Sequence, residues 1–148
     1  DGHTIKIGNG ISIETLHPPE TFKVSSAEAA NDSSLVLMIN YKRFKMLLTG
    51  DIERLGEQSI VASGKDINAD ILKVPHHGSK TSSSPEFIDG INPTYALVCV
   101  GENNYGHPSD EVVERYRDMG AQVITTKEAG AITIKTDGTG FSVEGYIN

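Results

Sequence analysis

Residues 69–79 read ADILKVPHHGS, an apolar run followed by a polar turn. The apolar part, residues 69–74, is short and bounded, as expected of a buried strand. Pro75 ends it, because proline has no N–H to donate to a strand ladder. Two adjacent histidines and a glycine follow at the strand end. The segment therefore predicts a buried strand that delivers polar side chains to one edge of a sheet.

Strand and helix patterns alternate along the chain on both sides of this segment. Short apolar, β-prone runs predict strands at residues 4–7, 11–16, 35–40, 44–48, 95–100, 122–125, 131–135 and 141–146. Helices are predicted at residues 52–63, from about Ser84, and from Ser109 to Gly120, with a polar loop at residues 22–33. Hairpins, then alternating strands and helices, then further strands predict an α/β (α+β) fold in which a mixed sheet packs against helices.

Two of the predicted helices begin with capping signals. Ser83 and Glu86 have the spacing of a capping box, in which each side chain bonds the other residue's backbone N–H. Ser109 precedes Asp110 and Glu111, which suit the first turn of a helix because the helix dipole favours negative charge there. These residues predict helix starts near positions 84 and 110.

The composition is that of one globular domain without a general affinity for nucleic acid. The chain has 148 residues, of which 37% are hydrophobic, and its formal net charge is −7. Binding to phosphates usually needs a basic surface, although bound metal ions can supply positive charge locally. No apolar run reaches the roughly 20 residues of a membrane-spanning helix.

Two smaller features bear on the cellular context. The single cysteine, Cys99, excludes an internal disulfide and lies in an apolar run, where we expect a buried, inert thiol. The chain opens with Asp1 rather than methionine. We therefore expect a piece of a longer protein, from which any membrane or export signal has been separated.

Asp51 is the first candidate for a functional side chain. Residues 45–51 read KMLLTGD, an apolar strand followed by a glycine and a carboxylate. Two interpretations are open. Asp51 either caps the helix that follows, a position where aspartate is strongly favoured, or binds one metal ion or bridges two.

His76 and His77 are more informative, because two imidazoles follow one strand directly. Neutral imidazole is a common ligand of zinc and similar ions. If the two rings point in different directions, one can bind metal while the other polarises a substrate or donates a proton. Ser79, Lys80 and Thr81 place hydroxyls and a cation before a helix, where an anion such as phosphate can bind. Ordinary hydrogen-bonded loop residues are the alternative interpretation.

His107 lies in a polar loop, residues 101–108, after the next strand. Asp51, the adjacent histidines and His107 follow three successive strands. A parallel arrangement of these strands brings their ends to one edge of the sheet. An Asp/His set favours zinc, manganese or iron over calcium. Two or three ligands are fewer than a two-metal hydrolytic site needs, so we expect an incomplete site. His3 and His17 are isolated, and we expect them to be structural.

Five motifs occur in an order that resembles one known family. They are residues 31–37 (NDSSLVL), 47–51 (LLTGD), 72–82 (LKVPHHGSKTS), 104–108 (NYGHP) and 130–134 (GAITI), the last one ahead of Asp137-Gly138. The series resembles the C-terminal metallo-β-lactamase-like domain of the ComEC/Rec2 DNA-internalisation competence proteins. It extends over nearly the whole chain, from about Ile5 onward.

The resemblance implies a metal-dependent hydrolase of the αββα sandwich fold, a nuclease or phosphodiesterase that acts on DNA during uptake. It implies zinc or manganese as cofactor, two ions in the complete domain, and attachment to a membrane channel domain on the extracytoplasmic side of a bacterial membrane. Asp51 matches the metal-bridging aspartate and His107 the last metal-binding histidine. Of the paired histidines, we assign His77 to the metal and His76, with Ser79, to catalysis, although the order within the pair is open.

The sequence departs from the family pattern in its first half. The His-x-His/Asp-x-Asp-His cluster that supplies most ligands in the superfamily does not occur before Asp51. We therefore expect residues 1–148 to form one partial domain, half of the sandwich, whose partner is the missing front half and which hydrolyses nothing alone. A small-molecule phosphodiesterase or esterase of the same superfamily and a non-catalytic binding scaffold are the alternatives.

Overall fold

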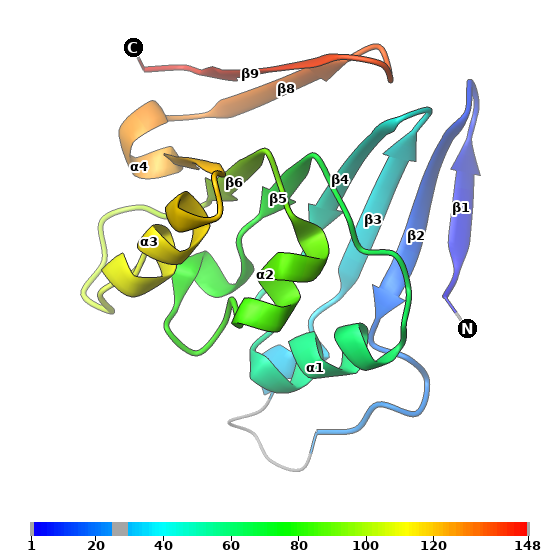
Figure 1. Ribbon diagram of the computed structural model, residues 1–148, viewed down its shortest axis with the longest axis horizontal. Coiled ribbons are helices and arrows are strands. Elements are labelled where there is room, and N and C mark those ends of the chain that lie inside the picture. The colour runs from blue at the N-terminus through cyan, green and yellow to red at the C-terminus, as the bar shows by residue number, and fades with distance from the viewer. Residues whose placement is uncertain (1, 25–29, 148) are drawn as a thin grey trace.

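A seven-stranded mixed sheet forms the centre of the molecule (Figure 1). The computed structural model describes residues 2–24 and 30–147. Strand order in the sheet follows chain order: β1 (Thr4–Ile7), β2 (Ile11–His17), β3 (Val36–Tyr41), β4 (Phe44–Leu48), β5 (Ile71–Lys73), β6 (Tyr95–Val98) and β7 (Gln122–Thr125). The strands from β1 to β4 pair antiparallel, and those from β4 to β7 pair parallel.

Each parallel connection carries a helix. These are α1 (Arg54–Ala62), α2 (Pro85–Ile91) and α3 (Asp110–Asp118). All three lie on one face of the sheet (Figure 1), as expected when successive crossovers share the same hand. The short helix α4 (Thr126–Ala129) follows β7, and β8 (Ile132–Thr136) with β9 (Phe141–Gly145) forms a separate two-stranded sheet. The predicted mixed α/β architecture is confirmed, whereas α4 was not predicted.

The two faces of the sheet are buried under different partners. Leu47 and Leu72 belong to the main core under the helices, which also contains Phe87 of α2. Ile71 and Leu97 point to the opposite face of the sheet and belong to a second core under the β8–β9 hairpin. Because successive side chains of a strand point to opposite faces, strands covered on both sides have unbroken apolar sequences.

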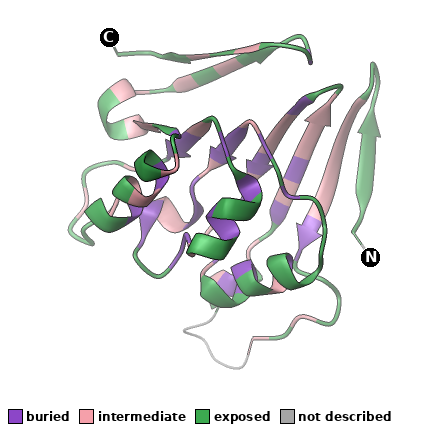
Figure 2. Cartoon of the chain, viewed as in Figure 1, coloured by how far each residue is buried: buried purple, intermediate pink, exposed green. Residues whose placement is uncertain are grey.

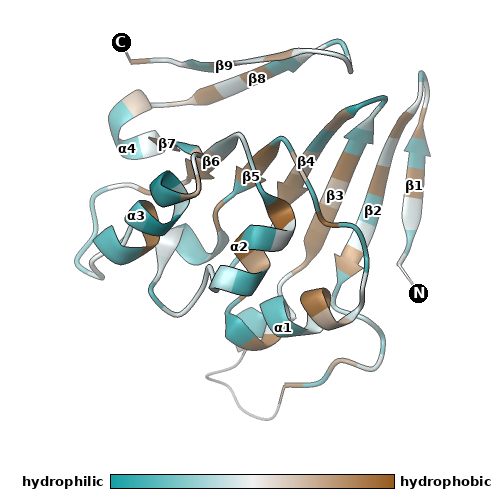
Figure 3. Cartoon of the chain, in the orientation of Figure 1, coloured by the Kyte–Doolittle hydropathy of each residue, from teal (hydrophilic) through white to brown (hydrophobic). Residues whose placement is uncertain are grey.

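The β8–β9 hairpin covers only part of the sheet face on which it lies. The strand register aligns one apolar row across the sheet, formed by Ile5, Ile13, Ile39, Met46 and Ile71. Ile71 is fully buried beneath the hairpin, whereas Ile5 at the other end of the row is 62% exposed. Figure 2 shows β1 exposed along its length, and Figure 3 shows apolar residues on the neighbouring strands. The face over β1 to β3 is thus apolar but has no covering layer among the described residues.

The start of α1 differs from the prediction. The helix begins at Arg54, so Asp51 is not its cap, and the N-cap residue Glu53 makes no capping bond with its side chain. Instead, Oδ1 of the buried Asp32 accepts hydrogen bonds from the N–H groups of Glu53 at 3.1 Å and Gly56 at 2.7 Å. A carboxylate from a distant segment therefore performs the role that a local side chain usually has.

The start of α2 is held in the same way. The capping box predicted for Ser83 and Glu86 is wrong, because the N-cap residue is Ser84 and its side chain makes no capping bond. The carboxylate of Glu57, in α1, accepts hydrogen bonds from the N–H groups of Ser83 and Ser84. Burial raises the pKa of Glu57 above the ordinary glutamate value. The two helix starts are therefore fixed by tertiary contacts.

Cys99 is exposed and not buried, because β6 ends at Val98 and the next residue is already outside the sheet. The loop predicted at residues 22–33 includes a 3-10 turn, Ala30–Ser33, and its residues 25–29 lie outside the described part. Within residues 2–24 and 30–147, the helices are too short and polar to cross a membrane.

His17, at the end of β2, is fully buried. Its Nε2 donates a hydrogen bond to the carbonyl oxygen of Asp32 at 2.7 Å, and its ring meets Phe22 edge-on with centroids 4.3 Å apart. Among the described residues Nδ1 has no hydrogen-bond partner, so the neutral ring fits best. Burial lowers the pKa of His17 below the ordinary histidine value. Its position agrees with the structural role predicted for it.

We expect the protein to lose stability as the pH falls below about 6.5, in part because of His17. The unfolded chain protonates this histidine near its ordinary pKa of 6.5, whereas the folded chain resists protonation to a lower pH. In that window the unfolded state binds more protons, so the free energy of unfolding falls on acidification. Urea unfolding at a series of pH values measures this slope. It should be shallower in His17→Gln and unchanged in His3→Gln, an exposed control; equal slopes in all three proteins contradict the prediction.

Candidate metal-binding site

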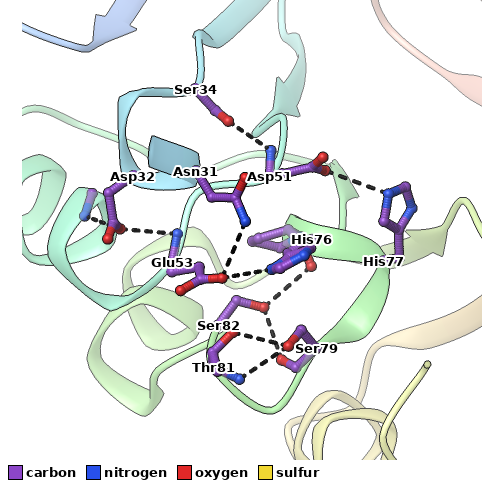
Figure 4. Close-up of polar contacts among 12 residues, drawn as sticks. Asn31, Asp32, Ser34, Asp51, Glu53, His76, His77, Ser79, Thr81 and Ser82 are labelled. Carbon is purple, nitrogen blue, oxygen red and sulfur yellow. Dashed lines mark hydrogen bonds and ion pairs between the residues drawn. The ribbon is translucent and has the colours of Figure 1, made fainter. Parts of the chain in front are cut away.

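The parallel strands bring the predicted site residues to one edge of the sheet. Asp51 follows β4, His76 and His77 follow β5, and His107 lies in the loop after β6. The ring centroid of His76 lies 6.2 Å from that of His77 and 5.6 Å from that of His107. Nε2 of His77 lies 3.7 Å from Oδ1 of Asp51 (Figure 4). Four of the five predicted site residues are therefore neighbours, as the strand-end positions predicted.

The histidine pair sits in a strained turn. Both residues have positive φ, 45° at His76 and 55° at His77, which non-glycine residues seldom adopt. Such conformations cost on the order of 1–3 kcal/mol each and gather at functional sites. The turn is anchored by a hydrogen bond from the His76 N–H to the Gly50 carbonyl at 3.3 Å and from the Ser79 N–H to the His76 carbonyl at 2.9 Å. This backbone sends the two rings toward different partners.

His77 is oriented toward Asp51. Its Nδ1 bonds to the carbonyl oxygen of Cys99, which assigns the proton to Nδ1 and leaves the lone pair on Nε2. Nε2 lies 3.7 Å from Asp51 Oδ1. Two donors bound at about 2.1 Å to one ion lie roughly 3–4 Å apart, so this pair has the spacing of metal ligands. The Lys73 ammonium group lies 3.6 Å from the same carboxylate oxygen and donates to the Gly50 carbonyl, which helps to hold the Asp51 loop.

His76 is oriented toward a carboxylate that the sequence analysis missed. Its Nδ1 lies 2.9 Å from Oε1 of Glu53, close enough for an ion pair but not aligned as a hydrogen bond (Figure 4). The side chain of Asn31 donates to the same Glu53 oxygen at 3.3 Å. A carboxylate behind an imidazole fixes the orientation of the ring. Glu53 follows Asp51 by two positions, and that acidic pair was the available signal.

The turn at residues 31–34 supports both halves of this arrangement. Asn31 holds Glu53, and Asp32 holds the start of α1, as described above. The hydroxyl oxygen of Ser34 accepts a hydrogen bond from the Asp51 N–H at 3.1 Å. Three side chains of one short turn therefore position the two acidic residues that face the histidines. The motif NDSS, which stands before β3, therefore supports the loop after β4 that carries Asp51.

His107 is held by its own loop. Oδ1 of Asn103 accepts from the His107 N–H at 3.1 Å, and Nδ2 of Asn103 donates to the His107 carbonyl at 2.7 Å. Burial, followed by the nearby charges of His76 and His77, lowers the pKa of His107 below the ordinary histidine value. The neutral ring that results is the form in which histidine binds metal.

Ser79, which the sequence analysis assigned to catalysis, lies in the turn that follows the histidine pair. It is buried, and its hydroxyl bonds to the hydroxyl of Thr81 at 2.9 Å and accepts from the Thr81 N–H at 3.3 Å. The donor types that do gather, imidazole and carboxylate, fit a zinc-type ion. Among the described residues, however, no three such side chains converge closely enough to form a metal cage. The donor set fits such an ion in kind but does not complete a coordination shell.

The fold and site define a mixed α/β domain with a candidate ligand site at the carboxyl ends of its parallel strands. No family model matches the chain. It is 38% identical to ComE operon protein 3 of Bacillus subtilis over 134 residues, or 86% of this chain and 17% of that protein. Identity is 34% to competence protein ComA of Neisseria gonorrhoeae (84% and 18%) and 33% to recombination protein 2 of Haemophilus influenzae (84% and 15%). The chain belongs, as a domain, to the ComEC/Rec2 family of competence proteins. It spans about a sixth of the length of these relatives.

The histidine turn packs closely against the His107 loop at Gly78. Replacing this glycine tests that contact. Its φ is +79°, and an added Cβ would lie 2.7 Å from Cβ of Pro108. We expect Gly78→Ala to displace the loop, to shift the His107 ring resonances in NMR spectra and to lower the free energy of unfolding by about 1–3 kcal/mol. Gly101→Ala, where an added Cβ meets no atom within 4 Å, is the matched control. Unchanged His107 resonances in Gly78→Ala contradict the prediction.

Proposed function

We propose that this chain is part of a metal-dependent phosphodiesterase that cleaves DNA during uptake, and that it is inactive without the rest of its domain. The observation that carries the proposal is the gathering of Asp51, His76, His77 and His107 at the carboxyl edge of β4, β5 and β6. Ligands collect at this edge in sheet-and-helix folds. Membership of the ComEC/Rec2 family supports a role in DNA uptake.

Each residue of the group has a role suited to its surroundings. Asp51 and His77 hold a zinc or manganese ion, because the free Nε2 lone pair and the carboxylate oxygen lie 3.7 Å apart. His107 is a further ligand, kept neutral by burial. His76 has its Nδ1 against Glu53, which leaves Nε2 to exchange a proton with an oxygen of the substrate. When bound, the metal ions of the complete site activate water and hold the phosphate oxygens.

A small phosphodiester or ester is the second candidate substrate. The net charge of −7 favours it, because long-range attraction to a DNA backbone is weak in an acidic protein. Both candidates use the same group of residues. A substrate panel on the complete domain separates them, with single-stranded DNA, double-stranded DNA and a small phosphodiester as members.

We further propose that a front half of the same domain covers the bare face of β1 to β3 and supplies the missing ligands. The apolar row from Ile71 to Ile5 is already covered at one end by β8 and β9, so a second sheet that continues this hairpin would bury the other end. The relatives are about six times as long as this chain, which leaves ample sequence for that half. In the same proposal, the longer protein carries a membrane channel domain and holds this domain on the extracytoplasmic side.

Metal titration followed by NMR of the five histidines tests the site. With zinc, and with paramagnetic manganese, we expect the resonances of His77, His107 and His76 to respond together and those of His3 and His17 to stay unchanged. His77→Gln should weaken zinc binding by at least about tenfold, because even the loss of a supporting contact to a ligand weakens binding about 10- to 100-fold. His3→Gln is the control. If none of the histidines responds at millimolar metal, the chain by itself is a scaffold and not a half-site.

The half-domain proposal predicts no hydrolysis by this chain alone and metal-dependent DNA cleavage once the front half is restored. Asp51→Asn in the restored domain should abolish that cleavage while leaving the free energy of unfolding nearly unchanged, because its side chain is partly exposed. Full activity of the isolated chain that is lost in Asp51→Ala contradicts the half-domain proposal.

Charge on the bare face tests where the front half docks. Ile5→Lys and Ile7→Lys should each weaken association with a separately supplied front half by about 10- to 150-fold, because burial of an isoleucine contributes about 1.5–3 kcal/mol. Both residues are largely exposed, at 62% and 49%, so the isolated chain should keep its stability. Thr4→Lys, on the opposite face of β1, is the control. A dimer of the isolated chain in sedimentation, broken by the same two substitutions, would instead identify a second copy as the occupant.

A further inference from the structure

A hollow of about 460 Å³ lies directly beside the candidate metal-binding site. It is lined by His77 and His107 on the side of that site and by the loop after β6 on the other. Tyr105 lines this hollow and is 84% exposed. None of the roles proposed above uses Tyr105 or the hollow. A substrate bound at the two histidines would extend into this space.

Tyr105 is placed as a stacking surface. Its ring lies nearly parallel to that of His107, with an interplanar angle of 27° and centroids 6.2 Å apart. An aromatic ring in this position offers a flat, weakly polar face next to His107, a proposed ligand of the metal ion that would hold a phosphodiester. Flat ligands bind such faces by offset stacking.

The loop that carries Tyr105 is held in place by a single side chain. Oδ1 of Asn103 accepts from the N–H groups of Tyr105 at 3.0 Å and His107 at 3.1 Å. Nδ2 of Asn103 donates to the carbonyls of Gly101 at 3.0 Å and His107 at 2.7 Å. These four hydrogen bonds from one amide hold the backbone of Tyr105 and His107 in place before any ligand binds. A prearranged surface of this kind loses little entropy on binding.

The remaining walls favour an uncharged ring. The hydroxyl of Thr126 accepts from the Val100 N–H at 2.7 Å and donates to its carbonyl at 2.8 Å, so these polar groups are already paired. The carboxylate of Glu102, in the same loop, forms an ion pair with Lys127 at 3.3 Å. The hollow therefore offers apolar contact and an aromatic face, and the metal-binding edge beside it offers the charge-bearing groups.

We propose that this hollow binds a nucleobase, stacked on Tyr105, of a single-stranded nucleic acid whose phosphodiester lies at His77 and His107. The proposal deepens the proposed function and rests on it, because it names the class of phosphodiester that the same site takes. A single strand is required, since in a duplex both faces of each base are occupied by its neighbours. Stacking on an aromatic side chain does not depend on which base is present, so the contact favours nucleic acid over simple esters without reading sequence.

A binding experiment on this chain separates stacking from phosphate contact. The probes are a short thymidine oligonucleotide and an abasic oligonucleotide of the same length, each titrated in the presence of zinc while the tyrosine rings are followed by NMR. We expect the thymidine strand, but not the abasic strand, to shift the Tyr105 ring resonances upfield. Tyr105→Ala should weaken binding of the thymidine strand by about 5- to 150-fold and leave binding of the abasic strand unchanged. Tyr105→Phe should restore the affinity.

Tyr146→Ala is the matched control, because Tyr146 is 85% exposed, follows β9 and does not line the hollow. Equal binding of the two strands, equal weakening of both by Tyr105→Ala, or no binding of the thymidine strand at millimolar concentration overturns the proposal. Its failure is distinguishable from that of the proposed function. A zinc response of His77 and His107 without a Tyr105 response leaves the metal site standing, and the reverse result leaves only the nucleobase site.

Discussion

The parallel pairing of β4, β5 and β6 is the constraint on which the candidate site depends. Its register sets Leu48 beside Lys73 and Lys73 beside Leu97, so the three strands end at the same level. The chain leaves each strand at that edge, and the loops carry Asp51, the histidine pair and His107 into one region. Residues far apart in the sequence thus become neighbours because of hydrogen bonds that involve none of their side chains.

The acidic residues that stabilise the helix starts lie beside, or connect to, the residues that position the site. Asp32 holds the first N–H groups of α1, and its neighbours Asn31 and Ser34 hold Glu53 and the backbone of Asp51. Glu57 connects α1 to the turn before α2 and so fixes the far end of the segment that begins with the histidines. Helix starts and site geometry therefore share one hydrogen-bond network, and a change in either affects the other.

The strand sequences also explain why one face of the sheet is left bare. Strands β4 to β6 have apolar residues on both faces, and helices cover one face while the β8–β9 hairpin covers the other. Strands β1 to β3 carry the same apolar pattern on the hairpin side, with Ile5 and Ile7 exposed. Exposure of such an apolar face to water raises the free energy of the folded chain. This is the physical basis for proposing that another layer covers it.

The sequence by itself determined the strands, the three longer helices and the positions of Asp51, His76, His77 and His107 at strand ends, because periodicity, proline and glycine act on the chain within a few residues. It did not determine the partners of those residues. The carboxylate behind His76, the carbonyl that sets the proton on His77 and the Asp32 carboxylate that holds the start of α1 all come from segments that meet only after folding. Tertiary structure decided them, because a hydrogen bond requires its two atoms to lie within about 3 Å of each other, whatever their separation along the chain.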